Sequence, residues 1–181
     1  MNVNRKHIII GTFLIVLAAA MKALTFPFSI NPIIAISLFS GAVIKDRKLS
    51  FALPLLSMFA SDLMLEIFNI APGFYGMGQI GNYASLLAVT LLGFTMKKTT
   101  PVTVPAYSVA ATLVFFVLSN TNCFLFDNLN TYGTGIQGWA SCLAAGIPFV
   151  KNGLITDLGF SAALFGTYTL ANKYYFEKAA A

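Results

Sequence analysis

The chain has 181 residues and a net charge of +5, with 57% hydrophobic and only 9% charged residues. A soluble domain carries roughly 25% charged residues, so this composition excludes an ordinary soluble domain and predicts an integral membrane protein. The basic residues do not alternate with aromatic side chains. This excludes nucleic-acid binding and favours attraction to anionic lipid headgroups.

Apolar runs along the chain predict one all-α domain over residues 1–178, an integral membrane six-helix bundle. A hydrocarbon core about 30 Å thick needs about 20 helical residues. The first run is predicted to be a retained helix, since no small-residue cleavage site with a polar chain behind it follows. Residues 179–181 are interpreted as an appended tail. The predicted spans are residues 7–24, 31–44, 49–70, 81–96, 102–118 and 152–172.

Two stretches of this pattern are irregular. The second span is short, and the preceding residues 26–32 could cross part of the outer leaflet in extended form if other helices bury them. If the second span were re-entrant instead, the basic loop at Lys45 would lie outside. Residues 119–151 are predicted to be an outer connection that includes a short amphipathic helix over residues 139–150. Pro54 predicts a kink in the third span, and residues 71–78 are rich in glycine and predict a loop.

The basic residues predict the orientation. Six crossings would place nine of the eleven Lys and Arg residues on one side and only Lys22 and Lys151 on the other. Because short basic loops stay in the cytoplasm, we expect both termini to be cytoplasmic, in the inner membrane of a bacterium. The nine residues are Arg5, Lys6, Lys45, Arg47, Lys48, Lys97, Lys98, Lys173 and Lys178.

Ionisable and amide side chains gather in the predicted outer half. At 1.5 Å per residue, Asp62 lies ~20 Å from the inner end of the third span. Ionisable groups are costly in a bilayer unless they are paired or hydrated, and they mark functional cavities by default. We therefore predict a polar pocket open to the outside above an apolar inner seal. The predicted ligand-binding residues are Asp62, Asn82, Tyr83, Asn122, Trp139, Lys151 and Asp157.

The charged members also have a structural interpretation. Lys22 and Asp62 could form an ion pair that only stabilises the fold. Glu66, Lys151 and Asp157 lie near predicted helix ends, where their side chains could extend to water. The spacing of Asp62 and Glu66 on one helical face would also suit acid–base chemistry or cation binding.

Aromatic and sulfur-containing residues leave further alternatives open. Trp139, Tyr132 and Phe149 could stack on a flat ligand or anchor the chain at the membrane interface. Cys123 and Cys142 both fall in the predicted outer connection. They could form a disulfide in an oxidising compartment or remain free.

Absent motifs restrict the chemistry. His7 is the only histidine, which excludes a histidine-ligated metal site and a serine–histidine protease. No Gly-rich phosphate loop occurs, so the chain lacks the usual ATP-hydrolysis motif. We predict that the protein is not an enzyme and has no cofactor. A membrane enzyme acting on a lipid is disfavoured for the same reasons, and energised transport would need a partner or an ion gradient.

Several motifs together resemble a family of small bacterial proteins of unknown function that is assigned to transport. That family is similar to the substrate-binding S components of energy-coupling-factor (ECF) vitamin transporters. The resemblance implies an S-component-like fold with an outer ligand pocket and docking on a transmembrane coupling subunit with ATPases through small residues of the first helix, here Ala19 and Ala23. The motifs are residues 31–42, Pro54, Ser61-Asp62-Leu63, Thr121-Asn122 and residues 145–166.

Two functions follow as expectations. The first is a substrate-binding membrane subunit that captures a small vitamin-like nutrient or its precursor for uptake. The second is a structural or accessory subunit of a larger membrane complex, in which the polar outer residues contact protein. Both place the chain in the lipid bilayer.

Overall fold

The computed structural model describes the backbone of residues 3–26 and 30–177, and the side chains of residues 13–26 and 30–173. The described residues form six helices and no strand, so the all-α prediction is confirmed. Three helical stretches are long and apolar enough to cross a membrane, namely Arg47–Ile67, Thr103–Leu125 and Gly135–Lys173. The helices are α1 (Val3–Leu24), α2 (Ile33–Val43), α3 (Arg47–Ile67), α4 (Met77–Phe94), α5 (Thr103–Leu125) and α6 (Gly135–Glu177). Residues 27–29, Lys178 and the predicted tail 179–181 lie outside the described residues.

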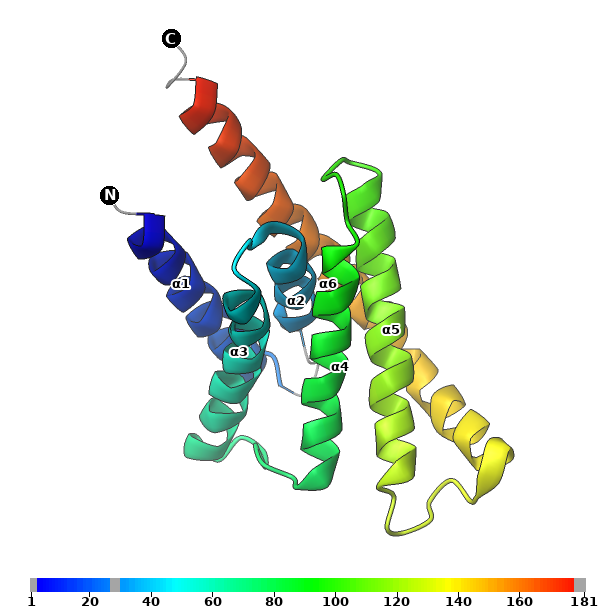
Figure 1. Cartoon of the computed structure of the whole chain (residues 1–181). Coiled ribbons are helices and arrows are strands. Elements are labelled where there is room, and N and C mark those ends of the chain that lie inside the picture. Colours follow the sequence, from blue (N-terminus) through cyan, green and yellow to red (C-terminus); the bar gives the residue numbers. More distant parts are fainter. Residues whose placement is uncertain (1–2, 27–29, 178–181) are drawn as a thin grey trace.

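Successive helices alternate in direction (Figure 1). The start of α1, the α2–α3 and α4–α5 connections and the end of α6 lie at one end of the molecule, at the top of Figure 1. Lys45, Lys97 and Lys98 belong to these two connections. We call this the inner end, after the orientation predicted from the basic residues. The other three connections lie at the opposite, outer end.

The second predicted span is a central helix of only 11 residues. At 1.5 Å per residue, α2 is about 16 Å long, too short to cross a 30 Å hydrocarbon core unaided. It contacts α3, α4, α5 and α6, and Ile33, Ala35–Gly41 are buried. A side chain on Gly41 would collide with the carbonyl oxygen of Thr90 in α4. Small residues of this kind let helix backbones approach closely.

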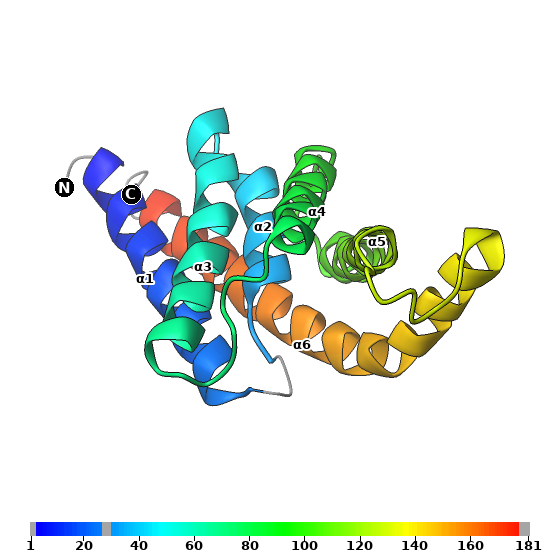
Figure 2. The same ribbon diagram turned by 90° about the horizontal axis from the view of Figure 1, so that it is seen from below.

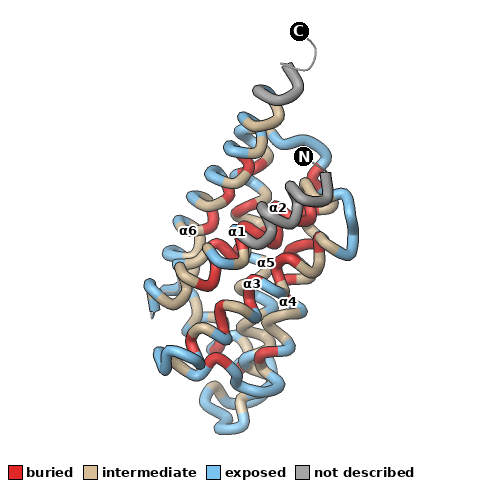
Figure 3. The backbone as a smooth tube through the Cα atoms, turned by 90° about the vertical axis from the view of Figure 1, so that its left-hand side faces the viewer, coloured by how far each residue is buried: buried red, intermediate tan, exposed pale blue. Residues whose placement is uncertain are grey.

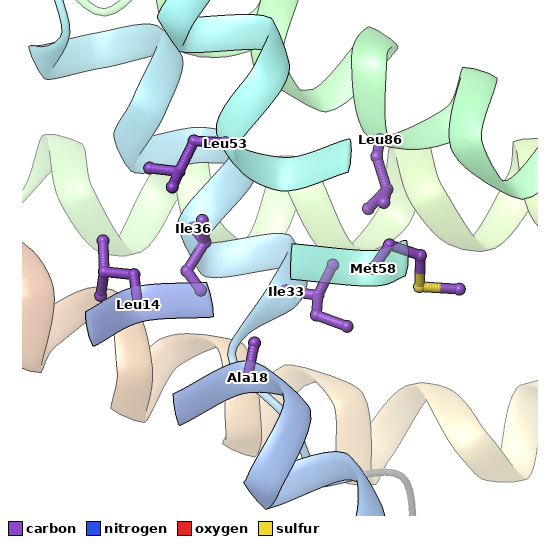
Figure 4. Close-up of a cluster of buried hydrophobic side chains, with 7 residues drawn as sticks. All are labelled: Leu14, Ala18, Ile33, Ile36, Leu53, Met58 and Leu86. Atoms are coloured by element: carbon purple, nitrogen blue, oxygen red, sulfur yellow. The ribbon is translucent and has the colours of Figure 1, made fainter. Parts of the chain in front are cut away.

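Buried residues run along the middle of the bundle (Figure 3). One apolar cluster joins the first four helices (Figure 4), and a second joins α2, α4, α5 and α6. Phe39 of α2 forms edge-to-face contacts with Phe165 and Tyr168 of α6, at centroid distances of 5.2 and 5.8 Å. The first cluster consists of Leu14, Ala18, Ile33, Ile36, Leu53, Met58 and Leu86. Both clusters include residues of α2, so this short helix holds the two sides of the bundle together.

The predicted outer connection is mostly helical, which corrects the prediction for residues 119–151. Helix α5 continues to Leu125, and α6 runs without a break through Pro148 for 43 residues, about 65 Å. Contacts with α5 support it on both sides of Pro148: the Cys142 thiol donates to the Asn120 carbonyl at 3.3 Å, and Asp157 contacts Thr112. Figure 2 shows α6 passing across the other helices, with its N-terminal part beyond α5.

Candidate functional site

Four polar side chains meet near the outer end of α1, α3 and α4. Asp62 Oδ1 accepts a hydrogen bond from Lys22 Nζ at 2.5 Å. Asp62 Oδ2 accepts from Gln79 Nε2 at 2.7 Å and from the Tyr83 hydroxyl at 3.1 Å. We call Lys22, Asp62, Gln79 and Tyr83 the Asp62 cluster. It contains a cation, an anion, an amide and a phenol, so it could recognise several kinds of polar group.

The helices place these four residues together because each contributes a position near its outer end. Lys22 lies in the last turn of α1, whereas Gln79 and Tyr83 lie in the first two turns of α4 and are four residues apart. Residues at that spacing share one helical face. The Asp62 side chain is only 1% exposed and Lys22 is 17% exposed. A buried charge requires a partner and hydrogen bonds, and the cluster supplies both.

The α3–α4 connection covers the Asp62 cluster. The Gly73 amide donates to Glu66 Oε2 at 2.8 Å, and Gln79 Nε2 also lies 3.1 Å from the Gly73 carbonyl oxygen. A side chain on Gly73 would collide with the carbonyl oxygen of Asp62. Glu66 is exposed, as the predicted extension to water implies, and its carboxylate also holds the connection that closes over Asp62.

An open hollow of about 400 Å³ lies next to this cover, lined by residues 66 and 69–72. Asn69 adopts a φ of 51° there, a conformation that asparagine tolerates better than most residues. A second open hollow of about 410 Å³ lies at the inner end, beside Lys97 and Lys98. Every buried polar side-chain atom among the described residues has a hydrogen-bond partner. The Asp62 cluster is thus closed and internally satisfied in this structure.

Asn82 and Asn122 lie near the first turn of α4 but do not contact Asp62. The Asn82 amide donates to the Tyr75 hydroxyl at 2.6 Å. The Asn122 amide donates to the Gly78 carbonyl, and its side chain occupies the space where Gly81 lacks a Cβ. Burial raises the pKa of the Tyr75 phenol, so this group in the α3–α4 connection is protonated at neutral pH. Asn122 therefore joins α5 to α4 and fixes the helix start that carries Gln79.

The remaining predicted residues lie apart from the cluster. The Trp139 ring nitrogen donates to the Thr121 hydroxyl at 2.9 Å. Lys151 is exposed and forms no ion pair with a described residue. Asp157 is buried against Thr112 in the middle of α5. The uninterrupted course of α6 explains the separation, because it carries Asp157 deeper than a helix beginning at residue 152 would.

Sequence reasoning missed Gln79 and treated Lys22 only as a structural partner. Gln79 follows the predicted loop 71–78 and precedes the predicted span 81–96, so it belonged to neither element. Its position four residues before Tyr83 was the available signal.

Both cysteines are free, with Cys123 exposed and Cys142 buried. No group of three His, Cys, Asp or Glu side chains that could hold a metal ion occurs among the described residues.

The described residues form an all-helical protein, and the length and composition of three of its helices suggest a membrane protein. The chain belongs to DUF6580, a family of unknown function, whose family model matches residues 2–179. No curated protein and no solved structure matches the chain. The family match assigns no activity to the chain and does not connect it with ECF S components. The resemblance to S components therefore remains a hypothesis.

Proposed function

We propose that this protein is a substrate-binding subunit that captures a small polar nutrient for uptake across the bacterial inner membrane. In this proposal all six helices cross or line the membrane, with both termini in the cytoplasm. The alternating helices and the basic connections at the inner end support this orientation, because cytoplasmic loops are enriched in Lys and Arg. The Asp62 cluster then faces the outside, where a nutrient arrives.

The observation that carries the proposal is the buried Lys22–Asp62 pair under the α3–α4 connection. The pair costs desolvation energy that an apolar pair would avoid, and intramembrane charges of this kind commonly serve binding. Lys22 would bind a carboxylate or phosphate of the ligand, while Asp62 would bind an amine or hydroxyl. A ligand with both kinds of group would replace the interactions that the two residues make with each other.

Access to the cluster would require movement of the α3–α4 connection. The connection is held at Gly73 by Glu66 and Gln79, and the neighbouring hollow is open. Two hydrogen bonds, each with a net contribution of about 1 kcal/mol, are few enough for ligand binding to reverse. Tyr83 and Gln79 would remain as ligand contacts after opening, and Asn122 would keep the start of α4 in place.

Coupling to an energy source is the S-component-like part of the proposal. The chain has no ATP-hydrolysis motif, so a transmembrane coupling subunit with ATPases would supply the energy. Ala19 is buried within the chain, with 3% exposure. Docking through the Ala19–Ala23 spacing is therefore disfavoured, and another face of the bundle would have to contact such a subunit.

A structural or accessory subunit of a larger membrane complex is the second candidate. The observation that favours it is that every buried polar side-chain atom in the described part of the chain has a hydrogen-bond partner, since a ligand site often leaves groups free to bind. In that case the polar outer residues would contact another protein. A stable stoichiometric partner in mild detergent, together with an empty Asp62 cluster, would support this candidate over the first.

The test is a binding screen on the full-length protein in lipid nanodiscs. Small polar nutrients are screened for a rise in unfolding temperature, and the best one is titrated against wild type, Asp62→Asn and Asp46→Asn. Asp46 caps α3 at the inner end by accepting from the Leu49 amide at 3.1 Å, and asparagine keeps that capping role.

We expect Asp62→Asn to bind at least about tenfold more weakly, which corresponds to about 1.4 kcal/mol, and Asp46→Asn to bind like wild type. Equal affinity of wild type and Asp62→Asn would remove Asp62 from the site. A screen without any stabilising compound, combined with copurification of a partner, would contradict the uptake proposal.

A further inference from the structure

A second buried carboxyl group lies at the α5–α6 interface. Asp157 is 2% exposed, and its Oδ2 lies 2.7 Å from the Thr112 hydroxyl oxygen. Thr112 is nine residues beyond the start of α5 at Thr103, about 14 Å along a helix of roughly 35 Å. Asp157 is therefore near the middle of the helix pair, at the depth where a charge is most costly.

No cation compensates Asp157 among the described residues, where the sole ion pair is Lys22–Asp62. The helices packed against α6 are α2 and α5, and neither contains Asp, Glu, Lys, Arg or His; their titratable side chains are Tyr107 and Cys123 of α5. On α6 itself, Lys151 is six residues before Asp157 and exposed, so it points to a different face. An ionised Asp157 would therefore lack a counter-charge.

The Thr112 hydroxyl can serve either protonation state of Asp157. Its oxygen lies 2.7 Å from Asp157 Oδ2 and 3.1 Å from the Ser108 carbonyl oxygen, but a hydroxyl has one hydrogen to donate. When Asp157 is ionised, Thr112 donates to the carboxylate. When Asp157 is protonated, its O–H donates to Thr112, and Thr112 donates to the Ser108 carbonyl.

Buried hydroxyl groups continue from this pair toward the inner end. Ser161 lies one helical turn beyond Asp157, and its Oγ is 3.2 Å from Ser108 Oγ. Ser108, Thr112 and Ser161 are at most 4% exposed. On both helices these hydroxyls lie on the inner side of Asp157, so a polar track crosses an otherwise apolar interface there.

We propose that Asp157 is a proton-binding site at the α5–α6 interface, with Thr112 as its positioning residue. In the binding step the carboxylate takes one proton from hydronium, whose O–H bond breaks to leave water. The new O–H bond forms on Asp157, and the Thr112 hydrogen turns from Asp157 to the Ser108 carbonyl. Release reverses these changes. The proposal does not depend on solute binding at the Asp62 cluster, which has its own cation.

A proton fits this site better than a metal ion. One carboxylate and one hydroxyl provide few oxygen ligands, whereas hard metal ions such as Mg²⁺ and Ca²⁺ take six or more. The described residues contain no group of three acidic, histidine or cysteine side chains that could hold a metal. A proton needs one acceptor and one hydrogen-bond partner, which is what Asp157 and Thr112 provide.

Infrared difference spectroscopy on the full-length protein in nanodiscs tests this site. Spectra at acid and alkaline pH are compared for wild type, Asp157→Asn and Asp62→Asn, and each is repeated in D₂O. We expect a carboxylic-acid C=O band in wild type that is lost in Asp157→Asn and kept in Asp62→Asn. A band that survives in Asp157→Asn, or a change that follows sodium concentration and not pH, would overturn the proposal.

A second variant keeps the test decisive if Asp157→Asn does not fold. Thr112→Val removes the hydroxyl and keeps the side-chain shape, so the Asp157 band should shift to higher frequency as its hydrogen bond is lost. Thr169→Val is the control, because Thr169 lies on α6 with Asp157 and its hydroxyl donates to the Phe165 carbonyl at 2.8 Å. An unchanged band position in Thr112→Val would remove Thr112 from the site and contradict the proposed geometry.

Discussion

Asp62 and Asp157 are both buried carboxyl groups, but their surroundings differ in kind. Asp62 receives three donors, one of them the ammonium group of Lys22. Asp157 has one hydroxyl partner and no cation among the residues whose side chains are described. The side of the bundle formed by α1, α3 and α4 therefore gives its buried carboxyl group a counter-charge, whereas the α5–α6 interface suits a charge that appears and disappears with a proton.

The comparison shows that burial alone does not define what a carboxyl group does. The two residues have nearly equal exposure, 1% and 2%, so the partners on neighbouring helices make the difference. A carboxyl group that is paired with a cation can exchange that partner for a ligand of opposite charge. A charge that is present only without its proton can respond to a proton gradient.

Removing the cation of Asp62 should have the largest effect on stability. Lys22→Met leaves a buried carboxylate unpaired and should lower the free energy of unfolding by about 3–5 kcal/mol. The double variant Lys22→Met/Asp62→Asn removes both charges and should be more stable than Lys22→Met alone. Reversible unfolding in detergent measures both. If the loss in the double variant equals the sum of the losses in Lys22→Met and Asp62→Asn, the ion pair does not stabilise Asp62.

Pushing the α3–α4 connection away from Asp62 should have the next largest effect. Gly73→Ala forces a methyl group against the Asp62 backbone and should cost about 3 kcal/mol, the upper part of the range for overpacking. Gly153→Ala is the matched change in the other region, where a Cβ would lie 3.5 Å from the Thr112 methyl carbon, an ordinary contact. Similar losses in both variants would contradict the tight closure over Asp62.

Removal of one neutral donor from Asp62 should have a smaller effect. Tyr83→Phe deletes a 3.1 Å hydrogen bond to an ionised acceptor and should cost about 1.5 kcal/mol. Tyr168→Phe serves as the control, since Tyr168 contributes a ring contact with Phe39. Unfolding free energies compare the two; equal values would mean that the Tyr83 hydroxyl does not stabilise the carboxylate.

Removal of the hydroxyl partner of Asp157 should have the smallest effect. Thr112→Val should cost about 1 kcal/mol at acid pH, where Asp157 is protonated, which is the value for a bond between neutral groups. The same variant should lose more stability at alkaline pH, because an ionised Asp157 then has no donor. Unfolding free energies measured over a pH series check this, and a pH-independent loss would indicate that Asp157 keeps one protonation state.

The sequence predicted the helical class and the closeness of Lys22 and Asp62 well, because both follow from composition and from residue depth along the chain. The predicted spans 7–24, 49–70 and 102–118 each match one end of α1, α3 or α5 to within a few residues. The prediction for residues 119–151 was wrong, since α6 begins at Gly135 and continues without a break through Pro148. Contacts with α5 support α6 on both sides of that proline.

The same error explains why Asp157 was grouped with Asp62. Depth was counted from a helix start at residue 152, whereas α6 begins at Gly135. Pairing across helices was also beyond the sequence, since Asp62–Gln79 and Asp157–Thr112 join residues 17 and 45 positions apart. Ligand binding by all seven residues remains a prediction: Asp62, Asn82, Tyr83, Asn122, Trp139, Lys151 and Asp157.

The central claim is that the Asp62 cluster binds a small polar molecule, and native mass spectrometry of the protein released from nanodiscs tests it most directly. Wild type, purified without added ligand, should carry a noncovalent small molecule that is absent or strongly reduced in Lys22→Met/Asp62→Asn and retained in Asp46→Asn. A wild-type protein that is always empty, or a bound molecule that persists equally in the double variant, would contradict the claim.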